Sequence, residues 1–251
     1  MKFERYILPV FLLFLWQLLS YVGVIPSYLL PSPIRIIFGF KDLMFVGMPP
    51  EHLLYDHARY SLYRVAYGFG IACLVGIPLG LIMGWSERIR ALIGPLIELV
   101  RPIPPLAWIP IAILWFGIGI KSAAFIIFLG TFFPILLNTI SGVVAINPIF
   151  LDAARSLNAK EKDIFFKVLI PGSIPSIFLG MRIGMGIGWM TLVAAEFTGV
   201  KEGYGLGYMI MTARDIQRPD EIIAGMLVVG IIGLFINWAF GALESKIVRW
   251  R

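Results

Sequence analysis

The residue types most often used in catalysis and metal binding gather in one short stretch of the chain. His52 and His57 are its two histidines, and Glu51 and Asp56 lie beside them. Two histidines five residues apart miss the four-residue spacing by which one helix face presents two ligands to a metal. No GxSxG-like elbow supplies a nucleophile for them. We therefore expect solvated surface here, and predict neither a metal site nor a catalytic site.

ATP hydrolysis by the chain itself would require a loop that holds nucleotide phosphates. The sequence contains no GxxxxGK[ST] pattern, and neither Gly-Lys-Ser nor Gly-Lys-Thr occurs in it. We therefore expect a protein that is not an enzyme and carries no cofactor. Any ATP and Mg²⁺ must be bound by another chain.

Charged side chains inside apolar stretches are the next candidates, because a charge in lipid is costly unless it is paired or lines an aqueous cavity. Arg182 and Glu196 are fourteen residues apart and share a helix face. They are separated by about 21 Å along the helix axis, so they cannot pair with each other. Glu196 has two equally supported interpretations: a structural pair with Arg64, or a position on a solute pathway.

Polar residues also form two stripes within the apolar stretches. One stripe contains Thr191 and Glu196; the other contains Thr131, Asn138, Thr139 and Ser141. Such side chains often serve only as contacts between membrane helices. We nevertheless predict that the central face of the third to fifth spans forms the translocation pathway. The predicted pathway or gate residues are Arg64, Asn138, Trp189, Thr191 and Glu196.

The elements that must position these residues are apolar helices. Of the 251 residues, 59% are hydrophobic and only 14% are charged, whereas about a quarter are charged in soluble domains. About 20 apolar residues cross a bilayer core, and a lone strand there would leave its backbone unbonded. We predict one all-α domain, residues 1–251, in the cell (inner) membrane, with about six transmembrane helices. The expected spans are 6–25, 61–85, 98–119, 123–146, 174–197 and 222–243.

The basic residues, which give a net charge of +6, flank the apolar spans and form no continuous patch. We therefore expect no nucleic-acid partner. Placing both termini in the cytoplasm puts eleven lysines and arginines in the inside loops and seven outside. This bias predicts cytoplasmic termini. It also places the loops at 86–92 and 147–173 in the cytoplasm.

The most specific signal is the charged loop between the fourth and fifth spans, residues 147–171. Its sequence, NPIFLDAARSLNAKEKDIFFKVLIP, predicts a short helix from Asp152 to Leu157, with the acidic residue near the end that the helix dipole favours. Asn158 accepts the left-handed conformation that ends a helix. A second helix follows until Pro171 stops it. We predict a helix, a sharp turn and another helix.

This loop resembles the EAA loop of ABC-importer membrane subunits, in which EAA is followed by three residues, Gly, nine residues and I-x-L-P. The spacing is kept here by Asp152, Ala153, Ala154, Asn158 and Pro171. Asp replaces Glu and keeps the charge. Asn replaces Gly and keeps access to the left-handed turn.

Stretches throughout the chain resemble one branch of that family, the nitrate/sulfonate/taurine-type permeases. The most specific is RPIPPLAWIPIAILWFGIG at 101–119, and LLPSP (29–33) and GLGYMI (205–210) also match. The resemblance implies a type I ABC importer (MetI-like) permease fold. It also implies a second permease copy, two ATP-binding-cassette ATPase subunits, and an extracytoplasmic solute-binding protein that delivers the cargo.

The resemblance further implies that the short helix at 152–158 inserts into a groove of the ATPase. The residues expected to couple are Asp152, Ala153, Ala154, Arg155, Leu157, Asn158 and Pro171. The predicted function is the permease subunit of an ATP-driven importer of a small anion-like solute. Two alternatives stay open: a non-transporting membrane scaffold or regulatory subunit, and an ion-coupled secondary carrier, which would be expected to lack such a loop.

Overall fold

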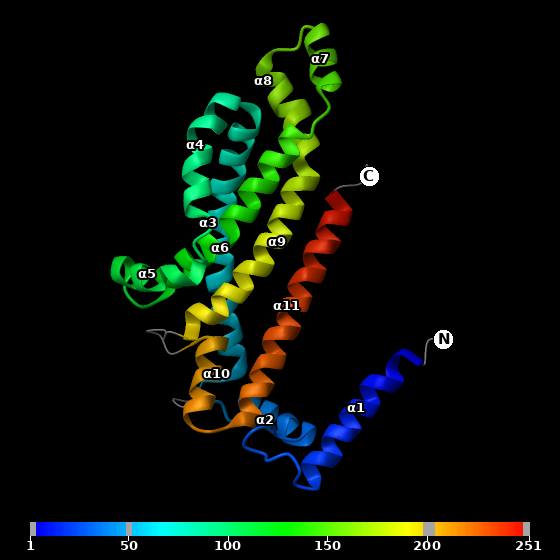
Figure 1. Ribbon diagram of the computed structural model, residues 1–251, viewed down its shortest axis with the longest axis vertical. Coiled ribbons are helices and arrows are strands. Elements are labelled where there is room, and N and C mark those ends of the chain that lie inside the picture. The colour runs from blue at the N-terminus through cyan, green and yellow to red at the C-terminus, as the bar shows by residue number, and fades with distance from the viewer. Residues whose placement is uncertain (1–3, 49–51, 198–203, 248–251) are drawn as a thin grey trace. The chain divides into compact units, whose positions relative to one another are not determined.

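The computed structural model describes residues 4–48, 52–197 and 204–247, and its regular elements in these ranges are helices (Figure 1). The predicted all-α class is confirmed. The chain divides into two compact units. Unit 1 is Met1–Leu62 with Glu196–Ile232, and unit 2 is Tyr63–Ala195 with Gly233–Arg251. The expected single domain stays a prediction.

Unit 1 contains helices from both ends of the sequence. They are α1 (Glu4–Tyr21), α2 (Pro33–Phe45), the first part of α3 (Leu54–Trp85), α10 (Leu206–Asp215) and the first part of α11 (Pro219–Ile247). The start of α2 is fixed locally. The Ser32 hydroxyl accepts a hydrogen bond from the backbone N–H of Arg35, at 3.3 Å, and Pro33 at the first position has the backbone angle that a helix needs.

An arginine ties α2 to the start of α11 within unit 1. The guanidinium of Arg218 lies 2.7 Å from Asp42, 3.0 Å from Asp220 and 2.9 Å from Glu221. Hydrogen bonds with Asp220 and Asp42 raise the pKa of Arg218. The backbones are equally close, because a Cβ on Gly39 would meet the carbonyl carbon of Asp220 at 2.8 Å. Glycine therefore permits the approach that brings these charges together.

Unit 2 holds most of the apolar helical mass. Its elements are the rest of α3, α4 (Glu87–Val100), the 3-10 turn η1 (Pro105–Trp108), α5 (Ile109–Phe116), α6 (Ile120–Val144), α7 (Pro148–Ser156), α8 (Glu161–Ile164), the π turn η2 (Phe165–Leu169), α9 (Ile170–Phe197) up to Ala195, and the end of α11. Helix α6 is its centre, with about half of its length buried.

Two rows of glycine allow α6 to pack tightly on both sides. Gly76, Gly80 and Gly84 of α3 face α6, and a Cβ on Gly80 would meet Thr139 at 2.6 Å. From α9, the residues that face α6 are Gly180, Gly184 and Gly188. Four-residue spacing of small residues lets membrane helices approach closely. These glycines therefore bring the backbones of α3 and α9 close to α6.

The expected third span, 98–119, is wrong as a single helix. The chain instead forms α4, which ends at Val100, and then η1 with α5, and the two parts are bent by 82°. The physical reason lies in Pro102, Pro104 and Pro105, which remove backbone donors and disfavour helix at the residue before each proline. The segment 98–119 is apolar enough to span lipid, but its helix is broken between Val100 and Pro105.

The other expected spans correspond to helices. Within the described ranges, four helices are long and apolar enough to cross a membrane, and the bent pair would make a fifth. The apolar part of α1 runs from Ile7 to Tyr21 and is shorter. The total of six spans and the cytoplasmic position of both termini stay predictions.

Candidate functional site

The charged loop forms a helical hairpin at one end of unit 2 (Figure 1). The Asn147 side chain caps α7 by accepting from the N–H of Ile149 at 3.0 Å. The backbone of Asn158 has φ of 59°, in the left-handed region, and separates α7 from α8. The predicted helix, turn and helix are confirmed. Helix α7 starts four residues earlier than expected, at Pro148, because Asn147 and Pro148 together form a helix start.

The role expected for Pro171 is wrong, because this residue does not stop a helix before the fifth span. Helix α8 continues through η2 into α9, and Pro171 is the second residue of α9. In the π turn, the N–H of Ile170 bonds to the carbonyl of Phe165, five residues back. Pro171 follows this π turn directly, where the regular i→i−4 hydrogen-bond pattern is already interrupted, so its missing N–H does not end the helix. The hairpin therefore connects to α9 without a break.

Ion pairs join the two arms of the hairpin. Arg155 of α7 donates through Nε to Glu161 of α8, at 3.1 Å, and its guanidinium lies 3.5 Å from Asp152. The hydrogen bond with Glu161 is the main cause of the raised pKa of Arg155. These side chains are exposed, so the pairs orient the hairpin and add little stability.

The hairpin also exposes apolar side chains. Ile149 is 69% exposed, Phe150 is 63% exposed and Leu157 is 85% exposed. Ala153 is exposed between them and has almost no side chain. Apolar residues grouped on a charged surface loop indicate a protein contact. The small alanine would allow a partner surface to approach the α7 backbone.

The base of the hairpin is anchored in the core of unit 2. Ile164 and Leu169 are buried, and Leu169 packs with Leu81 of α3 and Val143 of α6. The Phe165 ring contacts the ring of Trp85 edge to face, with centroids 6.1 Å apart. A displacement of the hairpin would therefore act on the ends of three long helices.

The predicted pathway residue Glu196 is bound inside unit 1. Its carboxylate is buried and accepts hydrogen bonds from the Ser61 hydroxyl at 2.8 Å and from the N–H of Gly207 at 2.9 Å. The missing Cβ of Gly205 leaves room for this carboxylate. The arrangement fixes the N-terminus of α10, where the helix dipole favours a negative charge.

The other predicted pathway residues belong to unit 2, and several of them take part in helix packing. Thr131 and Thr191 donate to carbonyls of their own helices, and a Cβ on Gly188 would meet Thr131 at 2.5 Å. Asn138 donates to the carbonyl of Pro134. These contacts support the packing interpretation of the stripes. Trp189 and Arg64 are also buried. A pathway role for any of these residues stays a prediction.

Arg182 is too far from Glu196 to pair with it, and it contacts two residues of α11 instead. Its Nε donates to Asn237 of α11 at 2.8 Å, and its guanidinium lies 3.8 Å from Glu244. Both contacts lie within unit 2. Of the two possibilities for a charge in an apolar span, a partner or an aqueous cavity, Arg182 has the partner.

The expectation of a solvated surface at the histidines is wrong for His57. Its ring is buried, with Nδ1 3.0 Å from the carbonyl oxygen of Gly205. His52 is half-buried and packs on Tyr204, with centroids 3.8 Å apart, while Tyr60 stacks on Tyr204 at 4.5 Å. Sequence reasoning missed this cluster because its two halves are about 150 residues apart.

Comparison with known proteins places these features in a family. Residues 76–249 match the model of the binding-protein-dependent transport system inner membrane component. A protein of Methanocaldococcus jannaschii named as an ABC transporter permease is 43% identical over 97% of this chain and 90% of its own length. The taurine transport system permease protein TauC of Escherichia coli is 35% identical over 95% of this chain and 86% of its own.

Another relative and a solved structure agree with this placement. The nitrate import permease protein NrtB of Synechocystis is 35% identical over 87% of this chain and 80% of its own length. The inward-facing MetNI methionine ABC transporter contains a chain that superposes with a TM-score of 0.64, covering 78% of this chain and 94% of that one. At 18% identity, this similarity concerns the fold alone, and it confirms the expected MetI-like fold.

Proposed function

This chain belongs to the family of inner membrane components of binding-protein-dependent transport systems, and we propose that it imports a small anion when a separate ATPase acts on its α7–α8 hairpin. It is the permease subunit of an ABC importer and a multi-pass membrane protein. The observation that carries the coupling proposal is the exposure of Phe150 and Leu157 on a hairpin anchored to three long helices.

The relatives support an anionic cargo. TauC is named for taurine transport and NrtB for nitrate import. A sulfonate and a nitrate share a compact oxyanion group. We therefore propose a solute that carries such a group.

The coupling proposal follows from the shape of the hairpin. Apolar side chains of α7 would enter a groove of the ATPase, and Asp152 to Asn158 would form the contact. Closure of the ATPase around ATP would displace α7, and the buried residues Ile164 and Leu169 would transmit the displacement to α3, α6 and α9. The ATP and Mg²⁺ would stay on the partner, so this chain would not itself be an enzyme.

The remaining partners complete the importer. A second copy of this chain would enclose the pathway with the first, and two ATPase subunits would bind below. An extracytoplasmic solute-binding protein would deliver the anion. Lipid would cover the outward apolar faces, such as Leu234, Phe235 and Trp238 of α11.

The test is a charge substitution on the docking helix with a matched control. Ala153→Arg should abolish ATP-driven uptake in vesicles that contain the ATPase and the binding protein, and ATPase should no longer co-purify with the permease. Ser245→Arg adds the same side chain at an exposed position near the end of α11 and should leave both measurements unchanged. Full uptake by Ala153→Arg would refute the coupling proposal.

A further inference from the structure

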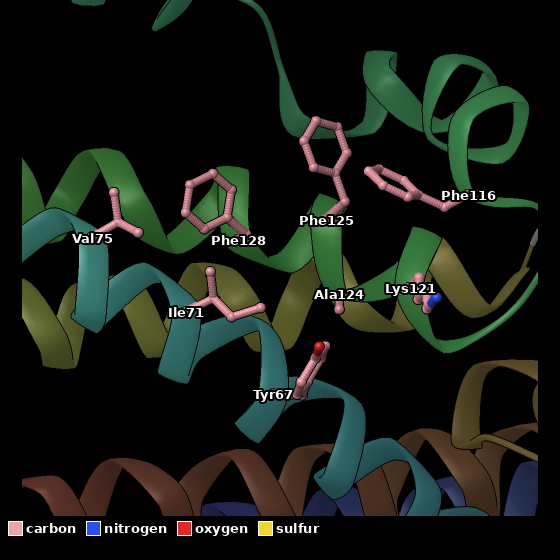
Figure 2. A pocket seen from close by; sticks show the side chains of 8 residues that line it. All are labelled: Tyr67, Ile71, Val75, Phe116, Lys121, Ala124, Phe125 and Phe128. Atoms are coloured by element: carbon pink, nitrogen blue, oxygen red, sulfur yellow. The ribbon is translucent and has the colours of Figure 1, made fainter.

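Unit 2 contains a cavity of about 310 Å³ between α3 and α6, beside the end of α5 (Figure 2). Tyr67, Ile71 and Val75 follow one another at four-residue intervals along one face of α3. Lys121, Phe125 and Phe128 line the opposite wall, on α6. The volume is at the lower end of the range typical of sites for small ligands.

The α3 and α6 helices touch beside this cavity. Immediately beside it, a Cβ on Gly68 would meet the carbonyl oxygen of Ala124 at 2.7 Å and the Cβ of Ile127 at 2.8 Å. The α3 and α6 backbones are thus in contact below Tyr67 and Lys121. The aromatic wall is also supported, since the Phe125 ring packs on Phe116 with centroids 5.5 Å apart. Packing contacts therefore support both walls of the cavity, although Tyr67, Val75 and Phe116 are each more than 40% exposed.

The polar end of the cavity carries a positive charge. Among the eight described residues that line it, Lys121 is the one ionised side chain, and Figure 2 shows it near Tyr67 at the same end. No carboxylate of the described residues forms an ion pair with it. Lys121 is also the second residue of α6, where the helix dipole disfavours a cation. A bound anion would relieve both costs.

We propose that this cavity binds the transported solute as an organic anion, with the oxyanion group at Lys121 and the carbon chain against Phe125 and Phe128. The proposal rests on the proposed function and adds a site to it. The predicted topology places Lys121 at the outer boundary of α6, so this site would receive solute arriving from outside. The Tyr67 hydroxyl lies on the opposite wall and would complete the polar end.

The wall chemistry selects an organic anion over a bare inorganic one. Apart from Lys121 and Tyr67, the described lining is hydrocarbon and aromatic ring. A bare nitrate would gain nothing from the apolar walls and would find few donors there in place of water. A short alkyl chain gains about 0.8 kcal/mol for each buried CH₂, which corresponds to about a fourfold gain in affinity.

The first experiment measures binding of taurine and hexanesulfonate to the full-length permease in phosphatidylcholine nanodiscs. Lys121→Gln should raise the Kd of both about tenfold, as expected for the loss of one charge-assisted contact. Lys41→Gln removes another outer lysine, on α2, which does not line the cavity, and should leave the Kd within about twofold. Equal effects of the two substitutions would overturn the proposal.

The second experiment tests the apolar wall. Wild-type affinity should increase from methanesulfonate to hexanesulfonate, and Phe128→Ala should flatten this increase while leaving the Kd of methanesulfonate nearly unchanged. Phe128→Leu keeps the apolar volume and should retain most of the chain-length dependence. The site would be refuted if Phe128→Ala left the dependence intact.

An anionic lipid or a second copy of the chain could occupy the cavity instead, and each would give a result different from those expected above. If the cavity holds an anionic lipid, phosphatidylglycerol in the nanodisc should occupy Lys121 and abolish sulfonate binding even in the wild type. If a second copy fills it, Val75→Cys in a Cys73→Ser background should form a disulfide-linked dimer, and either result overturns the proposal.

ATP-driven uptake by the complete importer distinguishes failure of the cavity proposal from failure of the proposed anion import. If no anion is taken up by the wild type, the proposed function fails. If uptake of sulfonates is normal and Lys121→Gln does not alter binding, this cavity alone is excluded.

Discussion

Ser61 of α3 donates its hydroxyl to the buried carboxylate of Glu196 at 2.8 Å, and the same oxygen accepts the N–H of Leu206 at 2.9 Å. One small side chain therefore joins the end of α9 to the start of α10. Glu196 completes the junction by accepting from Gly207. This network supports a structural contribution of Glu196, whether or not solute passes beside it.

Removing the Ser61 hydroxyl tests this junction. Ser61→Ala should lower the free energy of unfolding by about 1.5 to 3 kcal/mol, because a buried carboxylate loses a donor. The decrease should appear as a lower Tm of the detergent-purified protein. Ser245→Ala removes an exposed hydroxyl that bonds only within its own turn, and it should leave the Tm unchanged. A Ser61→Ala protein as stable as the wild type would show that the junction is dispensable.

Gly186 and Gly188 of α9 test helix packing, because alanine at the two positions should change the stability in different directions. Gly188→Ala should destabilise the protein by about 1 to 3 kcal/mol, since its Cβ would meet Thr131 at 2.5 Å. Gly186 faces open space, so Gly186→Ala should be neutral or stabilise by up to about 1 kcal/mol through helix propensity. The two Tm values check this. Equal shifts would contradict the packing of α9 on α6.

The left-handed residue of the hairpin can be tested with two substitutions. Asn158→Gly should preserve transport, because glycine adopts φ of 59° without strain. Asn158→Val should cost about 1 to 2 kcal/mol in that conformation and misalign α7 against α8. The measured quantity is solute imported per ATP hydrolysed. Unaltered coupling in both variants would indicate that the sharp turn is not needed.

The Arg218 cluster predicts a charge-specific loss of stability. Arg218→Gln should lower the Tm, because Asp42, Asp220 and Glu221 would be left close together without their cation. Arg218→Lys should restore part of the loss. Arg214→Gln removes an exposed arginine whose ion pair among the described residues is with Asp215, and it should change stability by less than about 0.5 kcal/mol. Similar Tm shifts for Arg218→Gln and Arg214→Gln would argue against a special role for the cluster.

The sequence alone determined the helical class, the positions of most long helices and the hairpin at residues 147–171. These features depend on local properties: apolar length, which sets where a helix can cross lipid, and the backbone preferences of Asn147, Pro148 and Asn158. Family resemblance added the coupling role.

Tertiary structure decided the features that depend on distant residues or on the summed effect of neighbours. His57 is buried and bonds through its ring to Gly205, 148 residues away, and no local sequence pattern joins the two. The 82° bend between α4 and α5 occurs at Pro102, Pro104 and Pro105. Apolar length alone predicted one straight span there, and the combined effect of three prolines breaks it. The cavity at Lys121 is lined by residues of α3, α5 and α6, beside the contact of Gly68 with Ala124, and only the packing of these helices sets its shape.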